Sequence, residues 1–182
     1  MSDTETKLYT MDDILAPPEG VRAELIDGRI YYMDHPPLIH QAIQGYIFSM
    51  LYGYAHVRNC AVFDANFGVY LTGDDLNFLL PDIAVICDRE KLSERGCEGA
   101  PDLIVEIVTP ASRKMDFLVK LHQYSSRGVR EYWIVDPESQ RTNVYFFEAD
   151  DPDFFRVYSF DEEIPVEIFQ GDLRIRLCDR DF

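Results

Sequence analysis

The sequence predicts an α+β fold in which helices flank a mixed β-sheet and a hairpin extends the N-terminus. Short apolar runs bounded by turn residues favour strands, whereas the apolar residues of the segment 38–54 recur at helical spacing. The segment 102–135 reads as strand, helix and strand with short links, which predicts two parallel neighbouring strands. The 182 residues contain no repeat and no linker, so we expect a single domain over residues 1–182.

The N-terminal elements follow from local signals. Thr10 can cap a short helix over residues 10–16, which the two following prolines end. In the stretch AELIDGRIYYM, two apolar segments flank Asp27-Gly28, a pair typical of a tight hairpin. A longer helix over 38–54 follows the hairpin.

The rest of the chain alternates between strands and turns. A strand over 60–71 can bulge at Gly68, and the charged segment 88–99 reads as a surface loop. A helix over 113–127 ends at Gly128, because glycine is favoured just after a helix. We expect the remaining strands at residues 78–87, 102–108, 131–135, 142–147, 154–160 and 173–177.

The composition is that of a globular protein without a membrane span. No apolar run approaches the roughly 18 residues of a membrane helix, and the polar, acidic N-terminus does not read as a signal peptide. We therefore expect a cytoplasmic protein. The cysteines form no CxxC pair, which argues against a zinc knuckle and predicts free thiols. They are Cys60, Cys87, Cys97 and Cys178.

The charge pattern bears on any nucleic-acid function. The chain has 33 acidic and 17 basic residues, and its net charge of −16 opposes binding to phosphates. The segment 109–130 is the exception, with five basic residues and one acid. Arg113 and Lys114 in this segment are candidate substrate contacts. A solvated helix face would show the same pattern, so this alternative stays open.

Asp82 and Glu106 are carboxylates within predicted strands. Because side chains alternate between the two faces of a strand, each of them interrupts an otherwise apolar face. A buried carboxylate without a partner is costly, so each requires a metal ion, a cationic side chain or backbone donors. Two hard oxygen ligands, with waters left on the ion, describe Mg²⁺ or Mn²⁺ rather than Zn²⁺. Such an ion stabilises charge on a phosphate and activates water.

The helix that follows carries a second group of polar residues. Asp116, Lys120 and Tyr124 are spaced by four residues and so share one helical face. The ammonium of Lys120 near the two carboxylates could orient a water molecule or stabilise a pentavalent phosphorus. The alternative is an exposed ion pair between Asp116 and Lys120, with Leu118 and Leu121 providing the packing.

Glu24 and His40 complete the candidate site residues. Glu24 lies inside the first hairpin strand, where the polar face of an alternating strand is the simpler interpretation. His40 lies in the first turn of the helix over 38–54, where a surface or capping histidine is the simpler interpretation.

The chain from Met11 to about Leu177 resembles the PD-(D/E)XK nuclease superfamily, and within it the Uma-two group of restriction-endonuclease-like proteins. The resemblance rests on an ordered set of segments. They are AELIDG, a helix opened by His40, LLPDIAVI, LIVEIVTPAS, DFLVK followed by Tyr124, and GVREYWIVDP.

This resemblance implies a restriction-endonuclease-like core that holds magnesium through Asp82 and Glu106, with Glu24 as the acid of the first motif. It also implies a homodimer. Superfamily members usually carry lysine two residues after the second acid, where this chain has Val108. The resemblance therefore assigns the role of that lysine to Lys120.

Three hypotheses follow. The first is a metal-dependent DNA endonuclease in which Asp82 and Glu106 hold the metal, Lys120 assists and Glu24 tunes the site. The second is a non-catalytic module that keeps the fold and binds a protein or nucleic acid, which the net charge and Val108 favour. The third is a hydrolase of a small phosphate ester, which would not need the basic helix.

Overall fold

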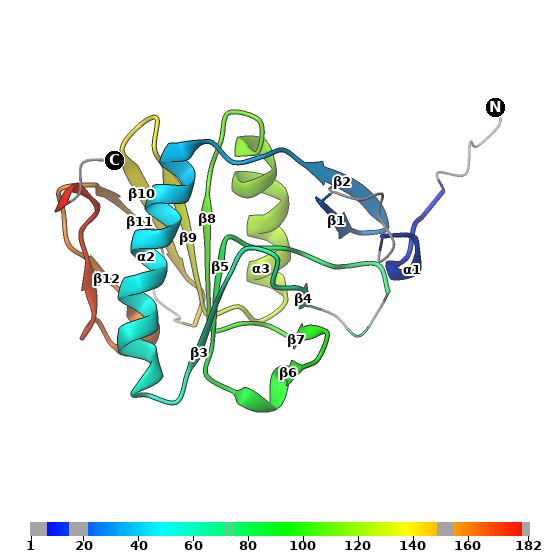
Figure 1. The fold of residues 1–182 in the computed structure, drawn as a ribbon, viewed down its shortest axis with the longest axis horizontal. Helices are drawn as coiled ribbons and strands as arrows, with labels where there is room; N and C mark the ends of the chain where they lie inside the picture. The colour runs from blue at the N-terminus through cyan, green and yellow to red at the C-terminus, as the bar shows by residue number, and fades with distance from the viewer. Residues whose placement is uncertain (1–6, 15–21, 72, 74, 149–154, 180–182) are drawn as a thin grey trace.

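The computed structural model describes residues 7–14, 22–71, 73, 75–148 and 155–179. Their centre is a six-stranded sheet with the strand order β11-β10-β9-β8-β5-β3 (Figure 1). Its strands are β3 (Ala61–Asp64), β5 (Ile83–Ile86), β8 (Leu103–Ile107), β9 (Glu131–Asp136), β10 (Arg141–Phe146) and β11 (Phe155–Ser159). Strands β8 and β9 are parallel and the other neighbours are antiparallel, so the predicted mixed sheet and α+β fold are confirmed.

The two faces of this sheet are covered by different parts of the chain (Figure 1). One face packs against α2 (Leu38–His56) and the C-terminal segment, which includes β12 (Ile164–Pro165) and β13 (Arg174–Ile175). The other face packs against the helix before β9 and against residues from the N-terminal half, including Ile26 and Val69. Because both faces are covered, the inner strands are apolar on both sides, as the run Leu103–Val105 shows.

The predicted N-terminal hairpin is confirmed. Strands β1 (Arg22–Ile26) and β2 (Arg29–Met33) pair antiparallel around Asp27 and Gly28. Both turn residues have positive φ, 48° and 71°, as a tight two-residue hairpin turn requires. The predicted first helix is α1 (Met11–Ile14), and its predicted end at residues 15–18 lies outside the described residues.

The predicted strand over 60–71 is wrong as a continuous element. The chain turns at Asn66, which has a φ of 75°, so that β3 lies in the central sheet and β4 (Val69–Tyr70) in a separate small sheet. In that small sheet β4 is parallel to β7 (Gly96–Glu98), which also pairs with β6 (Leu92–Ser93). The predicted loop over 88–99 therefore contains two short strands and a turn of 3₁₀ helix.

The helix predicted over 113–127 has two parts. Residues Met115–Lys120 form a π-helix, and α3 (Leu121–Ser126) continues it as an α-helix. Leu118 lies on the side opposite to Asp116 and Lys120 and is 60% exposed, so the packing suggested for it is wrong. Such π-helical turns are rare and occur frequently at functional sites.

The expectation of four free thiols is wrong for one pair. Cys60 and Cys87 form a disulfide. Strand register explains the pairing, because Ala61 lies opposite Ile86 in the β3–β5 ladder and the two cysteines are the next pair along it. Their separation of 27 residues gave no local signal. Among the described residues, no helix combines the length and hydrophobicity needed to cross a bilayer.

Candidate functional site

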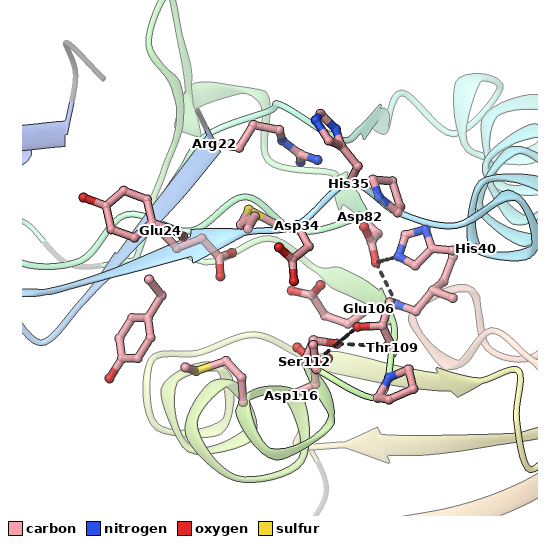
Figure 2. A pocket seen from close by; sticks show the side chains of 18 of the residues that line it. Arg22, Glu24, Asp34, His35, His40, Asp82, Glu106, Thr109, Ser112 and Asp116 are labelled. Atoms are coloured by element: carbon pink, nitrogen blue, oxygen red, sulfur yellow. Dashed lines mark hydrogen bonds and ion pairs between the residues drawn. The ribbon is translucent and has the colours of Figure 1, made fainter. Parts of the chain in front are cut away.

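A cavity of about 510 Å³ opens where the hairpin, the start of α2, the strands β5 and β8 and the π-helix meet (Figure 2). Six of the residues predicted from the sequence line it. They are Glu24, His40, Asp82, Glu106, Asp116 and Lys120. All six are buried, with exposed fractions of 2–7%. Segments distant in the sequence therefore bring these polar side chains to one place.

Lys120 contacts three of the carboxylates that line the cavity. Its Nζ lies 2.8 Å from Glu106 Oε1, 2.9 Å from Glu24 Oε1 and 3.8 Å from Asp116 Oδ1. Burial alone would lower the pKa of Lys120, but the three surrounding carboxylates raise it well above its ordinary value. The side chain is therefore a fixed ammonium, and the alternative of an exposed ion pair with Asp116 does not describe it.

Glu106 lies on β8, and two side chains of the following helix donate hydrogen bonds to its carboxylate. Its Oε1 accepts hydrogen bonds from Lys120 Nζ and from the hydroxyl of Tyr124, at 2.8 and 2.9 Å. Burial raises the pKa of Glu106 well above its ordinary value, and the neighbouring carboxylates add to this, while Lys120 opposes it. Burial likewise raises the pKa of Asp116. The cluster thus holds three carboxyl groups around one ammonium, and burial makes it costly for all three to be charged.

Asp82 immediately precedes β5 and is fixed by different partners. Its Oδ2 accepts a hydrogen bond from the backbone N–H of Ile107 at 2.8 Å, and the same oxygen lies 3.0 Å from His40 Nε2. The amide of Gln44 donates to the Asp82 carbonyl at 2.9 Å. The first turns of α2 therefore orient this carboxylate, and His40 is a pocket residue rather than a surface histidine.

Glu24 connects the hairpin to the rest of the site. Its Oε1 accepts the backbone N–H of Leu80 and the ammonium of Lys120, both at 2.9 Å. Hairpin register places Glu24 opposite Tyr31, on the face that looks into the cavity. The interpretation of Glu24 as part of a solvated strand face is therefore wrong.

The three other candidate residues lie outside the cavity lining. Tyr124 is fully buried behind Glu106 and packs edge-on against Tyr132, which makes it a support for the carboxylate. Arg113 bonds Asp136 at 2.9 Å and contacts another acid in the loop after β9. Lys114 is exposed.

The basic segment is largely neutralised by acidic side chains. Besides Arg113 and Lys120, Arg127 lies 3.5 Å from Asp27, and Arg130 bonds both Asp102 and Glu148. The charge pattern of residues 109–130 therefore does not translate into a free cationic surface. Counting charges along the sequence could not show these pairings, because every acidic partner except Asp116 lies outside the segment.

Sequence reasoning missed several residues of the cavity wall. Arg22, Asp34 and Ser112 line it, and Figure 2 shows the Asp34 side chain directed toward Glu106. A usable signal existed for Arg22, because it lies two residues before Glu24 and strand side chains two apart share a face. Asp34 gave no such signal, since it follows the end of β2.

Val108 is 4% exposed and belongs to the apolar cluster on this face of the sheet. The ammonium group beside Glu106 comes instead from the helix, through Lys120.

Comparisons with known proteins identify the fold and the family of the chain. An uncharacterised protein of Synechocystis sp., slr1290, is 23% identical over 123 residues, which are 67% of this chain and 64% of that protein. A crystal structure of a putative nuclease belonging to DUF820 from Anabaena variabilis matches with a TM-score of 0.75 and 25% identity, over 93% of this chain and 96% of that one. The family model of the Uma2 putative restriction endonucleases matches residues 9–177. The chain thus has a restriction-endonuclease-like fold and belongs to the Uma2 family.

Proposed function

We propose that this protein is a metal-dependent DNA endonuclease that hydrolyses phosphodiester bonds in the cavity around Lys120. The observation that carries the proposal is the buried convergence of Glu24, Glu106 and Asp116 around a single lysine ammonium, in a cavity that Asp82 also lines. A structural ion pair needs one carboxylate for each ammonium, whereas this cluster has an excess of buried negative charge facing a cavity. Such an excess favours the binding of a cation.

The donor set fits a magnesium or manganese ion. Among the described residues, Asp82 Oδ1 and Glu106 Oε2 accept no hydrogen bond, while the second oxygen of each is held by protein donors. Carboxylate oxygens are the ligands that these ions prefer. Within the same part of the chain, no three His, Cys, Asp or Glu side chains are grouped as a metal cage. An ion bound by one or two carboxylates, with waters completing its shell, suits Mg²⁺ rather than Zn²⁺.

The roles of the protein groups follow from their contacts. Asp82 and Glu106 would hold the ion, which when bound would supply Lewis-acid stabilisation of the phosphate and a water of lowered pKa. Lys120 remains charged and is placed to orient that water or to stabilise charge on the phosphate. Glu24 fixes the ammonium from the hairpin, and His40 fixes Asp82 from α2.

A plasmid-nicking assay tests this proposal. Wild-type protein should convert supercoiled plasmid to the open circle with Mg²⁺ or Mn²⁺ and should not do so in EDTA. Asp82→Ala and Lys120→Ala should each lower the rate at least about a hundredfold, the usual cost of losing one electrostatic group of an active site. Glu94→Ala is the matched control, because it removes an exposed acid outside the cavity.

Equal nicking by all four proteins would show that the activity is a contaminant and would end the proposal. Absence of nicking by a folded wild-type protein in both metals would leave the fold as a binding module for a protein or nucleic acid. We further propose that the enzyme is a homodimer, which light scattering on the purified protein would test.

A second candidate is hydrolysis of a small phosphodiester in the same cavity. The observation that favours it is the neutralisation of Arg113, Arg127 and Arg130 by acidic side chains, which leaves little free positive surface for a long duplex. Turnover of bis(p-nitrophenyl) phosphate without plasmid nicking would support this candidate, and the reverse would support the endonuclease.

A further inference from the structure

Arg22 is a cavity residue that the roles above leave unused. It begins β1, two residues before Glu24, and lies opposite Met33 in the hairpin ladder. Its side chain therefore projects from the same face of β1 as Glu24, and both line the cavity. In Figure 2 its guanidinium extends toward the side of the cavity where His35 and Asp82 lie.

The guanidinium of Arg22 has buried donors without acceptors. Its Nε and Nη2 are both shielded from solvent, and neither has a hydrogen-bond partner among the described residues. By contrast, Arg113, Arg127 and Arg130 each pair with an acidic side chain. A guanidinium keeps its charge at any physiological pH, so buried and unmatched N–H groups carry a desolvation cost. Buried donors of this kind call for a ligand that supplies the acceptors.

Glu24, Asp82 and Glu106 are engaged by groups other than Arg22. The ammonium of Lys120 pairs with Glu24 and Glu106. Asp82 pairs with His40 and accepts a hydrogen bond from the backbone N–H of Ile107. Arg22 therefore does not serve to neutralise these three acids. Among the described residues that line the cavity, the other permanent cation is Lys120, whose ammonium already contacts Glu24 and Glu106.

We propose that Arg22 binds a phosphate group of the substrate, with Nε and Nη2 donating to two phosphate oxygens. The planar fork of a guanidinium matches two oxygens of one phosphate, which an ammonium cannot do. This inference rests on the proposed function and deepens it, because it assigns substrate recognition to the hairpin. In this assignment Lys120 acts at the reacting phosphate, and Arg22 increases the affinity for the nucleic-acid backbone.

Fluorescence anisotropy with a labelled 20-base-pair DNA duplex tests the assignment, in Ca²⁺ so that cleavage does not interfere. Arg22→Gln should weaken binding about tenfold at low salt. It should also make the plot of log K against log salt concentration shallower by about 0.9, the loss of one phosphate contact. Arg22→Lys should restore the slope and only part of the affinity, because it keeps the charge and loses the fork.

Arg156→Gln is the matched control, because it removes the same charge from an exposed position on β11 and should bind like wild type. Titration with Mn²⁺ should give the same affinity for Arg22→Gln and wild type, which a general disruption of the site would not. Circular dichroism checks the fold, and if Arg22→Gln does not fold, the incomplete affinity of Arg22→Lys carries the test.

Unchanged affinity and slope in both Arg22 variants would overturn the assignment while leaving the proposed nuclease intact. A wild-type protein that neither binds nor nicks DNA would overturn the proposed function, and the role of Arg22 with it.

Discussion

A glutamate is buried on each face of the central sheet, and the two glutamates differ in their hydrogen-bond partners and in their access to a cavity. Glu106 on β8 faces the helix and the hairpin, and Glu131 on the neighbouring β9 faces α2 and the C-terminal segment. Glu131 is fully buried, and its two oxygens accept from the indole of Trp133 at 2.6 Å and the backbone N–H of Ile168 at 2.9 Å. Glu106 has one oxygen held by protein donors and faces a cavity.

By this difference Glu131 is a structural carboxylate, whereas Glu106 is a candidate site residue. Burial raises the pKa of both groups, to about 7 for Glu131 and well above the ordinary value for Glu106. A perturbed pKa therefore does not distinguish them. What distinguishes them is the surroundings: Glu131 accepts a hydrogen bond from the C-terminal segment, whereas Glu106 shares a cavity with four other carboxylates and an ammonium.

The largest effect is expected from removing the ammonium. Lys120→Met should lower the free energy of unfolding by about 3–5 kcal/mol at pH 8, because Glu106, Glu24 and Asp116 would remain buried without their cation. Losing the cation raises the pKa of Glu106 further, so the variant binds more protons when folded than when unfolded. The loss should therefore shrink as the pH falls from 8 to 5. Urea unfolding at the two pH values measures it, and a loss that grows toward acid would contradict this account.

The next effect compares the two glutamates in catalysis. Glu106→Gln should reduce plasmid nicking about 10²–10³-fold, because it removes charge from the proposed metal site. Glu131→Gln changes the same atoms on the other face and should retain wild-type nicking at a temperature where the variant is folded. Equal losses in both variants would mean that the two faces do not differ as described.

Glu131 itself should make the protein less stable as the pH rises. Its folded pKa of about 7 lies above the ordinary value of 4.5, so the folded state holds a proton that the unfolded state has released. Stability from this group is therefore present below about pH 4.5 and falls until about pH 7. Wild type should lose about 2–3 kcal/mol relative to Glu131→Gln between pH 4.5 and 8. Parallel stability curves for the two proteins would refute the shift.

The smallest effect concerns the support of Glu106. Tyr124→Phe removes one hydrogen bond to Glu106 Oε1 and leaves the packing against Tyr132, so it should cost about 0.5–1.5 kcal/mol of stability. Lys120 still holds the same oxygen, so nicking should fall less than in Glu106→Gln. Denaturant midpoints and nicking rates measure both, and a loss as large as that of Glu106→Gln would make Tyr124 part of the reacting centre.

Much of the fold was predictable because its signals are local. The Asp27-Gly28 turn, the apolar periodicity of α2 and the β8–helix–β9 unit each lie within a short stretch of sequence. The break between β3 and β4 and the Cys60–Cys87 disulfide depend on which distant strands pair, which no short stretch encodes.

For the candidate site too, local signals were readable from the sequence and long-range pairings were not. Asp82, Glu106 and Lys120 were identifiable because polar residues interrupt apolar elements or follow a helical spacing. The strand that begins at Glu131 was predicted, but the partners of its carboxylate were not, because one of them, the backbone N–H of Ile168, lies 37 residues away. The pairing of Arg113 with Asp136 and of Arg130 with Asp102 was also hidden, since these partners lie 23 and 28 residues apart in the sequence.

Binding of Mn²⁺ followed by isothermal titration calorimetry tests the central claim most directly. Wild type and Glu131→Gln should show the same saturable binding to one site, and Asp82→Ala and Glu106→Gln should lose it. Identical heats in all four proteins, or no binding by wild type, would contradict the claim that the Glu106 face of the sheet is a cation-dependent site.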